Sequence, residues 1–293
     1  MTRNSAQSMT VLAVTQGLLQ PVVAFLLLTS AVTGRAQSEA IVTDTSGSPR
    51  PAAAKESISP ISPLLADWIG ERIDFHVAFG IVPAGKARLE VLDTVRINGQ
   101  LALHALSTAR SAKSFDLIFK VRDSIETWFD ADSIYALRFR KRLREGPYRD
   151  EKVVEFVLAD SLVRWQDDGK EKPPLVVEPR VQDVLSAGYK ARLLPMSVGD
   201  TFSIRTHDVN KTYDLMVIVH ARETVETPAG VFDCFKVEPV LRSGGLFKKE
   251  KGARVFVWVT ADTRRIPVQM QSKVSFGTIT AVMQSYTPPS SQR

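Results

Sequence analysis

The sequence predicts an all-β, mainly antiparallel fold: one large twisted sheet, or an open half-barrel or spiral, with one helix packed on it. Three observations support this prediction. Apolar and polar residues alternate over many short segments, as in strands with one buried and one solvated face. Glycine, proline and other turn residues separate these segments at short intervals. A single segment has the spacing of an amphipathic helix.

Residues 1–36 are predicted to be a signal peptide, which would export the chain to the periplasm or cell envelope. No charged residue occurs from Asn4 to Gly34, and residues 21–28 form an apolar centre. Small residues at Gly34 and Ala36 suit a signal peptidase, so we expect cleavage after Ala36. The alternative is an uncleaved membrane anchor over about residues 11–32, which would also export the rest of the chain.

The remainder is predicted to consist of a tether and one domain. Residues 37–63 are rich in Ser, Pro and Ala and have no apolar period, which indicates a flexible tether. Residues 64–288 are predicted to form a single antiparallel β domain. No later apolar run is long enough to cross a bilayer, so no integral membrane span is expected after signal removal.

Composition excludes some classes of protein. The 293 residues carry 38 Lys and Arg against 32 Asp and Glu, a net charge of +6, which is too mild to indicate nucleic-acid binding. Cys234 is the only cysteine, so an intramolecular disulfide is impossible. An exported domain of this kind must be stabilised by its hydrophobic core, which this chain length allows.

Residues 75–91 predict the first hairpin, because apolar residues occupy the odd positions on both sides of Pro83-Ala84-Gly85. Proline presets φ and glycine accepts a left-handed φ, so these residues are predicted to form a three-residue loop. The apolar pairs on one face would then be Ile81 with Ala87, Phe79 with Leu89, and Val77 with Val91.

The rest of the domain follows the same alternation. Pro228-Ala229-Gly230 is predicted to join two more strands, before and after it in the chain. The other predicted strands are residues 101–108, 124–129, 135–143, 153–158, 161–166, 201–206, 253–260, 266–276 and 278–284. One helix is predicted over residues 181–193, with Pro179 near its start and Pro195 after its end.

Six segments, in order from about residue 73 to 286, resemble the bacterial domain-of-unknown-function 3108 family. They are FHVAFGIVPAGKARLEV, FDLIFKVRDSIETWFD, LREGPYRD, VQDVLSAGYKAR, ETPAGVFDCFKVEP and VFVWVTADTRRIPVQM. The resemblance implies an exported envelope protein with antiparallel β architecture and no established reaction. It also implies a broad similarity to the half-barrel and spiral folds of envelope lipid carriers. One departure is Gly188, where the family pattern has a bulkier residue.

No catalytic residue, metal site or cofactor is predicted. Cys234 lies within a predicted strand and fits a buried small hydrophobe better than an activated thiolate. The histidines lack the spacing of metal ligands, although His76 and His104 could meet on neighbouring strands. Three carboxylates within the family-like segments are predicted to be structural: Asp123, Glu145 and Asp183. A less favoured alternative is an envelope hydrolase that uses Asp123 or Asp183.

A basic strand is the most suggestive local feature. Arg138, Arg140 and Arg142 alternate with Leu137, Phe139 and Lys141 and would form a ridge on one face. The ridge is predicted to contact an anionic ligand such as a lipid head group, lipopolysaccharide or another envelope polymer. The alternative is a water-facing strand whose arginines pair with cross-strand carboxylates such as Glu126 or Glu155.

The function predicted from these observations is non-enzymatic. The concave apolar face of the sheet would hold an acyl chain or another apolar ligand, or would only enclose the helix. Four residues are predicted to form this apolar interior: Phe79, Phe139, Leu185 and Tyr189. The alternative is an interaction scaffold whose sheet is fully plugged by the helix.

Overall fold

The computed structural model describes residues 68–242, 254–274 and 277–292, so the predicted signal peptide and tether lie outside the described residues. Within these ranges the first half of the sheet is formed by β1 (Arg72–Phe79), β2 (Val82–Ile97), β3 (Gln100–Ser111), β4 (Arg122–Asp130), β5 (Ala136–Glu145), β6 (Tyr148–Val157), β7 (Leu162–Asp167) and β8 (Lys170–Val176). The second half is formed by β9 (Thr201–Asp208), β10 (Lys211–Thr227), β11 (Gly230–Arg242), β12 (Arg254–Thr260), β13 (Pro267–Val274) and β14 (Gly277–Thr287). The α-helices are α3 (Lys113–Asp116) and α4 (Val184–Arg192).

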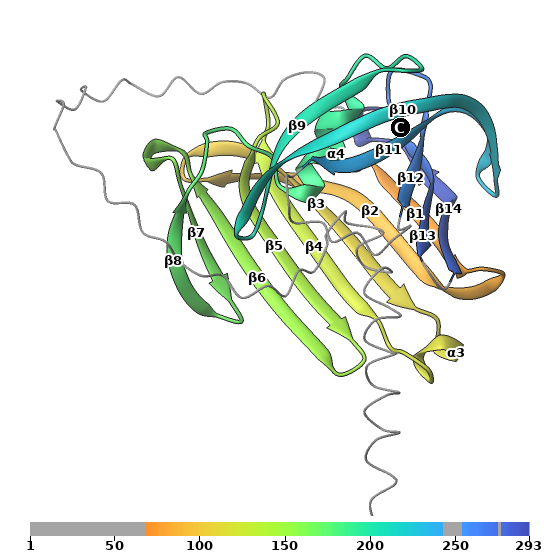
Figure 1. Ribbon diagram of the computed structural model, residues 1–293, viewed down its shortest axis with the longest axis horizontal. Helices are drawn as coiled ribbons and strands as arrows, with labels where there is room; N and C mark the ends of the chain where they lie inside the picture. The colour runs from red at the N-terminus through yellow and green to blue at the C-terminus, as the bar shows by residue number, and fades with distance from the viewer. Residues whose placement is uncertain (1–67, 243–253, 275–276, 293) are drawn as a thin grey trace, which may run out of the picture.

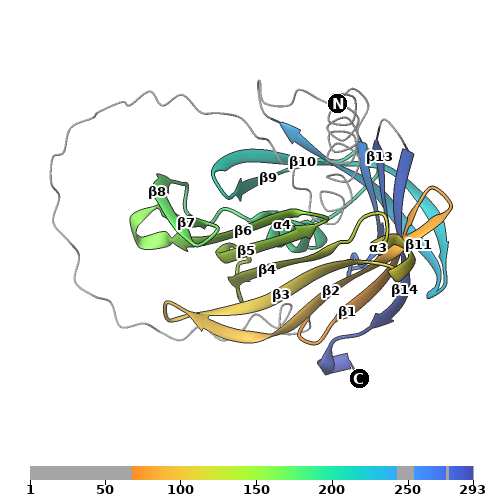
Figure 2. The same cartoon turned by 90° about the horizontal axis from the view of Figure 1, so that it is seen from below.

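All fourteen strands belong to one antiparallel sheet, in the order β8-β7-β6-β5-β4-β3-β2-β1-β14-β13-β12-β11-β10-β9. The pairing of β1 with β14 joins a first arm, β1–β8, to a second arm, β9–β14. Figures 1 and 2 show the sheet curling so that the two arms lie on opposite sides of α4, and α4 contacts β4 and β9. The sheet stays open, with β8 and β9 at its ends. The predicted fold class is confirmed.

The alternation of apolar and polar residues along the strands puts the apolar side chains in the core, as expected. Along β4 the side chains of Asp123, Ile125, Thr127 and Phe129 are buried, while the residues between them are partly exposed. Successive side chains of a strand point to opposite faces, so a slip of one residue would expose Phe129. One hydrophobic cluster fills the space between the first arm and α4, and another packs α4 against the second arm.

The first hairpin turns three residues earlier than the sequence predicts. Phe79 pairs with Val82, so the loop is Gly80-Ile81 and Ile81 is 98% exposed. Gly80 has φ 56°, and a type II′ turn requires a positive φ at its first loop position. The predicted Pro-Ala-Gly loop is therefore wrong. The predicted pairings are wrong as well, although Phe79 and Leu89 do share one face and pack in the same cluster.

Gly85 is instead required by a close approach between strands. A Cβ on Gly85 would lie 2.2 Å from the backbone oxygen of Arg110 on β3, a distance that no side chain tolerates. Gly85 pairs with Val77 inside the sheet, next to a bulge in β2 at Ala84. Glycine in a strand commonly marks such a bulge or close approach.

Two further differences concern turns and edges. The second hairpin is confirmed, but Thr227 pairs with Gly230, so its loop is only Pro228-Ala229. Strand β8, which the sequence analysis does not predict, is polar and contains Pro173 and Pro174. It is the edge strand of the first arm, where proline costs no hydrogen bond of the sheet.

The helix is shorter than the predicted 181–193, because Asp183 caps its N-terminus. Val181 and Gln182 are extended and hydrogen-bond both arms. The Ala136 N–H donates to Val181 O at 2.9 Å, and the Gln182 N–H donates to Arg205 O at 2.9 Å. Residues 181–182 thus connect β5 of the first arm to β9 of the second. Within the described residues, no helix is long and apolar enough to cross a membrane.

Candidate functional site

The N-terminal end of α4 is fixed by a capping box. The buried Asp183 carboxylate accepts the N–H groups of Leu185 at 2.8 Å and Ser186 at 2.9 Å, and also the Thr127 hydroxyl of β4. The Ser186 hydroxyl in turn accepts the Asp183 N–H at 2.9 Å. Such a box satisfies N–H groups that a helix start leaves unpaired. Burial raises the pKa of Asp183 to about 6, against the lowering effect of its hydrogen bonds.

The C-terminal end of α4 is fixed by a buried ion pair. The Arg192 guanidinium donates to the two Glu71 oxygens at 2.6 and 2.8 Å, and the side chains are only 5% and 3% exposed. Arg192 Nε also donates to the Arg264 backbone oxygen at 3.0 Å. Its guanidinium lies 4.9 Å from the centre of the Trp68 ring. Both ends of the helix are therefore anchored by buried polar contacts.

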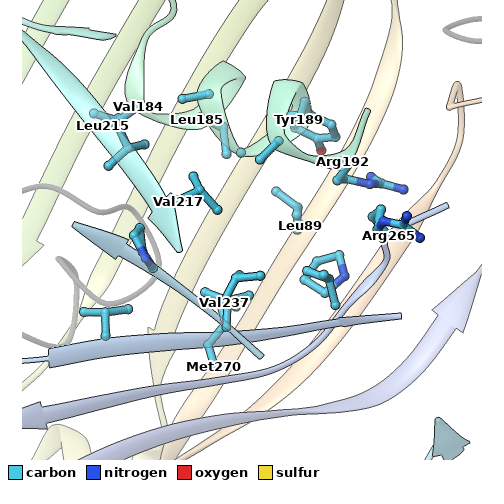
Figure 3. Close-up of a pocket in the computed structure, with 18 of the residues that line it drawn as sticks. Leu89, Val184, Leu185, Tyr189, Arg192, Leu215, Val217, Val237, Arg265 and Met270 are labelled. Atoms are coloured by element: carbon cyan, nitrogen blue, oxygen red, sulfur yellow. The ribbon is translucent and has the colours of Figure 1, made fainter. Parts of the chain in front are cut away.

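An apolar cavity of about 140 Å³ lies between α4 and the second arm. The helix lines it with Val184, Leu185 and Tyr189, among others, and β2 contributes Leu89 (Figure 3). The inner face of the second arm contributes one aliphatic side chain or more from each of four strands: Val217, Val237, Val257 and Met270. The helix therefore leaves an apolar space inside the sheet.

Gly188 is the position on α4 where this space is left open. It lines the cavity, and a Cβ added there would have no atom within 4 Å. Glycine inside a helix costs about 1 kcal/mol relative to alanine, so it is unfavourable for the helix itself. The departure from the family pattern noted in the sequence thus coincides with the cavity wall.

Polar groups gather at one end of the cavity. Figure 3 shows Tyr189, Arg192 and Arg265 together on one side, and Val184, Leu215 and Val217 on the other. Tyr189 is 2% exposed, and its hydroxyl has no hydrogen-bond partner among the described residues. The same is true of Arg265 Nε, which is also buried. The cavity is therefore apolar along most of its wall and polar at one end.

The four residues predicted for the apolar interior have three different positions. Leu185 and Tyr189 line the main cavity. Phe139 is 1% exposed and packs in the cluster between the first arm and α4, away from the cavity lining. Phe79 lines a second, smaller cavity of about 30 Å³ near the first hairpin.

The predicted arginine ridge lies on the outer face of β5. Phe139 points inward, so its neighbours in the strand point outward. Each arginine has a cross-strand carboxylate on β6. Arg138 lies 3.4 Å from Glu155, whereas Arg140 and Arg142 lie 2.6 and 3.1 Å from Glu151. The structure brings the ridge together but places it on the opposite face from the cavity, and its contact with an anionic ligand stays a prediction.

Two of the predicted structural carboxylates form a buried acidic pair. Asp123 and Glu145 are each 4% exposed, and each has one oxygen without a hydrogen-bond partner among the described residues. The Arg144 N–H donates to the other Asp123 oxygen at 2.6 Å. Burial, and then the charges of Asp123 and Asp150, raises the pKa of Glu145 to about 8. Burial raises the pKa of Asp123 to about 6.

The remaining candidates for chemistry are held in other contacts. Cys234 is buried, and burial raises the pKa of its thiol to about 12. His76 on β1 and His104 on β3 are separated by β2, so the expectation that they could meet on neighbouring strands is wrong. In the described part of the chain, Asp150, Asp167 and Asp168 have metal-like spacing, but the Lys152 ammonium pairs with Asp150 at 2.6 Å and with Asp167.

Apart from Leu185 and Tyr189, sequence reasoning missed the residues that line the cavity. The inner valines of β10, β11 and β12 follow the predicted alternation, but no local signal shows that α4 stops short of them. Arg265 sits beside Arg264 in a turn and looks like an ordinary surface residue. Gly188 carried the one available signal, its departure from the family pattern.

Comparison with known proteins places the chain among proteins of unknown function. No curated protein matches it. A beta-barrel-like protein of the domain of unknown function DUF1849 from Brucella abortus has a TM-score of 0.52 and 11% identity, covering 76% of this chain and 99% of its own. At that identity the likeness shows a shared fold alone.

Two further solved structures have lower TM-scores. A candidate lipoprotein from Parabacteroides distasonis has a TM-score of 0.33 and 12% identity, covering 75% of this chain and 96% of its own. A candidate exported protein with a YmcC-like fold from Bacteroides fragilis has a TM-score of 0.31 and 13% identity, with the same coverage. The model of the DUF3108 family, proteins of unknown function, matches residues 74–284. This match spans most of the chain, which therefore belongs to the DUF3108 family.

Proposed function

We propose that this protein is an exported, non-enzymatic component of the bacterial envelope that binds a lipid or another apolar ligand. A hydrocarbon chain of the ligand would enter the cavity between α4 and the second arm. The observation that carries the proposal is the apolar cavity of about 140 Å³ beside Gly188. Apolar cavities of about 150 Å³ in other proteins stay dry and bind benzene, so this one would enclose about six carbon atoms.

Several features support binding over a purely structural role for the helix. A scaffold with a fully plugged sheet would gain stability from a larger residue at position 188, because filling an apolar void restores packing contacts. Instead α4 has glycine there. Anchors at both ends hold the helix at a fixed place above the second arm, so the cavity does not depend on a mobile element.

Other observations support export and the absence of catalysis. The uncharged apolar segment and the small residues at Gly34 and Ala36 fit a signal peptide. Both oxygens of Asp183 accept hydrogen bonds from Thr127 and the start of the helix, which suits a structural role. Asp123 is buried beside Glu145 on the inner face of the first arm, away from the cavity lining.

The proposal is tested by measuring ligand binding to the full chain as purified from the envelope fraction. Native mass spectrometry after gentle purification should show a lipid adduct. After delipidation, calorimetric titration with uncharged n-alkanols should give about fourfold tighter binding per added methylene, which corresponds to about 0.8 kcal/mol each. The gain should stop once about six carbons are enclosed. Absence of both the adduct and alkanol binding would rule out the proposed function.

Gly188 offers matched variants for the same titration. Gly188→Phe should abolish alkanol binding because the ring would occupy the cavity. Gly188→Ala adds one methyl group in open space, so binding should persist while the free energy of unfolding rises by about 1 kcal/mol. If Gly188→Phe is folded and still binds alkanols with unchanged affinity, the ligand lies elsewhere.

A further inference from the structure

The polar end of the cavity contains two buried donors that lack acceptors. The Tyr189 hydroxyl and Arg265 Nε have no hydrogen-bond partner among the described residues, and both side chains line the cavity. Figure 3 shows the Tyr189 oxygen on the side of the ring that faces Leu89 and Arg192. Buried polar groups in native proteins are nearly always hydrogen-bonded, so two orphans at one end of one cavity need an explanation.

The neighbouring Arg192, by contrast, has acceptors for its hydrogen-bond donors. Both of its terminal nitrogens donate to Glu71, and its Nε donates to the Arg264 backbone oxygen. Its charge is therefore balanced within the protein. Arg265 has only backbone acceptors, with Nη1 donating to Ala261 O at 2.7 Å and also to Asp262 O. The Arg265 guanidinium lies 5.3 Å from the centre of the Phe235 ring, but no carboxylate of the described residues forms a salt bridge with it, so no anion balances its positive charge.

The backbone of Arg265 is also strained. Its φ of 48° lies in the left-handed region, which disfavours residues with a Cβ. The residue occupies the turn between β12 and β13, next to the buried Ile266. Such outliers persist where the surrounding structure enforces them, and they concentrate at ligand sites. Six other non-glycine residues of the described chain also have a positive φ, so what distinguishes Arg265 is that this strain coincides with an unpaired donor and an unbalanced charge at the cavity.

We propose that the ligand is an aliphatic monocarboxylate, whose carboxylate binds Arg265 and Tyr189 while its chain extends along the apolar wall of the cavity. This inference rests on the proposed function and names its ligand class. One carboxylate has two oxygens for the two donors, and its single negative charge balances the single uncompensated arginine. A phosphate monoester carries more negative charge at neutral pH than this end of the cavity balances. The carboxylate also gains charge-assisted hydrogen bonds, which are stronger than neutral ones.

The head-group assignment is tested by comparing octanoate with 1-octanol, which share the length of their chain. Calorimetric titration of the delipidated full chain at pH 7.5 should show that octanoate binds at least tenfold more tightly than octanol. Charged hydrogen bonds of a buried ligand give a difference of that size. Dodecyl phosphate, compared with dodecanoate, should bind more weakly at the same pH.

Variants at Arg265 and Tyr189 separate the contribution of the carboxylate head group to binding from that of the hydrocarbon chain. Arg265→Gly relieves the left-handed backbone and should therefore fold, yet it should bind octanoate no better than octanol. Arg265→Lys should keep part of the preference because it keeps the charge. Tyr189→Phe should lower octanoate affinity about fivefold and leave octanol affinity unchanged, since it removes one hydrogen bond. Arg264→Gln is the matched control, because Arg264 is exposed and paired with Asp262 at 2.6 Å.

The possible outcomes distinguish this inference from the function on which it rests. If wild-type protein binds octanol and octanoate equally, or if Arg265→Gly keeps a tenfold preference for the acid, the carboxylate assignment is wrong and cavity binding stands. If dodecyl phosphate binds more tightly than dodecanoate, the head group is a phosphate and the monocarboxylate is wrong. If wild-type protein binds none of these amphiphiles, both proposals are wrong.

Discussion

Glu145 shows how one buried side chain makes stability depend on pH. Its pKa is raised to about 8 from an ordinary value of 4.5, because burial and the nearby Asp123 disfavour its charged form. Since the folded pKa lies above the unfolded one, the protonated carboxyl stabilises the fold below about pH 4.5. That contribution is lost as pH rises through about 8. The protein should therefore be less stable at pH 9 than at pH 6.5.

Replacing this carboxyl tests the effect directly. Glu145→Gln should raise the free energy of unfolding at pH 9 by on the order of 4 kcal/mol and flatten its pH dependence between 6.5 and 9. Urea unfolding at several pH values measures this. Glu155→Gln, on the outer face, should behave like wild type. An equally steep loss of stability in Glu145→Gln would mean that another group controls it.

At the scale of elements, the anchors of α4 set its position above the second arm. Arg192 and Glu71 are buried together, and removing one partner of such a pair leaves an uncompensated charge in the interior. Arg192→Met should lower the free energy of unfolding by about 3–5 kcal/mol. The double variant Arg192→Met with Glu71→Leu should recover most of that loss, because no charge is then buried.

Urea unfolding of the single and double variants shows whether an unpaired buried charge or lost packing destabilises Arg192→Met. The exposed pair of Arg205 and Glu178 is the control, and Arg205→Met should cost less than about 1 kcal/mol. A double variant no more stable than Arg192→Met would show that lost packing on Trp68, and not the unpaired charge, explains the destabilisation.

The elements also show how far the sequence could predict this fold. Alternation identified most strands correctly because each has one buried face, which a sequence records locally. The loop at Gly80-Ile81 was misplaced because Pro83-Ala84-Gly85 has the residues of a turn. The reason for Gly85 is the backbone of β3, which no local pattern reveals. Strand β8 was missed because an edge strand does not need alternating apolar residues, and not every one of its backbone N–H groups has to donate a hydrogen bond within the sheet.

The candidate site was less predictable for a related reason. Leu185 and Tyr189 were expected in the interior because of helical spacing, and they line the cavity. The other walls come from strands far along the chain, so the space appears only when both arms are assembled. The uncompensated charge of Arg265 likewise depends on which carboxylates lie nearby in space, and in the sequence Arg265 follows a paired arginine.

At the scale of the whole molecule, the structure gives the least support to the prediction that the arginine ridge contacts an anionic ligand. Three arginines face three carboxylates, Glu126, Glu151 and Glu155, so this stripe of the outer face has no excess positive charge. A basic residue near an anionic membrane contributes about 1 kcal/mol. Replacing Arg138, Arg140 and Arg142 by Gln together with the three carboxylates leaves the net charge of the stripe unchanged, so this variant should bind anionic vesicles within about fivefold of wild type.

Co-sedimentation with vesicles that contain phosphatidylglycerol, at low salt, measures this difference, and vesicles of phosphatidylcholine alone provide the control. A hundredfold loss would show that the ridge is the anionic contact predicted from the sequence. It would also mean that the carboxylates release their arginines when the protein meets the membrane.

The pairing of β1 with β14 has a consequence for biogenesis. Glu71 and Tyr286, which meet beside this pair, lie 215 positions apart in the chain. A ribosome adds about 5–20 residues per second, so β1 waits about 10–40 s for the strand that covers its edge. Contacts of such high sequence separation also slow folding. Until translation ends, β1 offers an open edge to any other nascent chain, and a holdase that keeps the polypeptide unfolded would protect it.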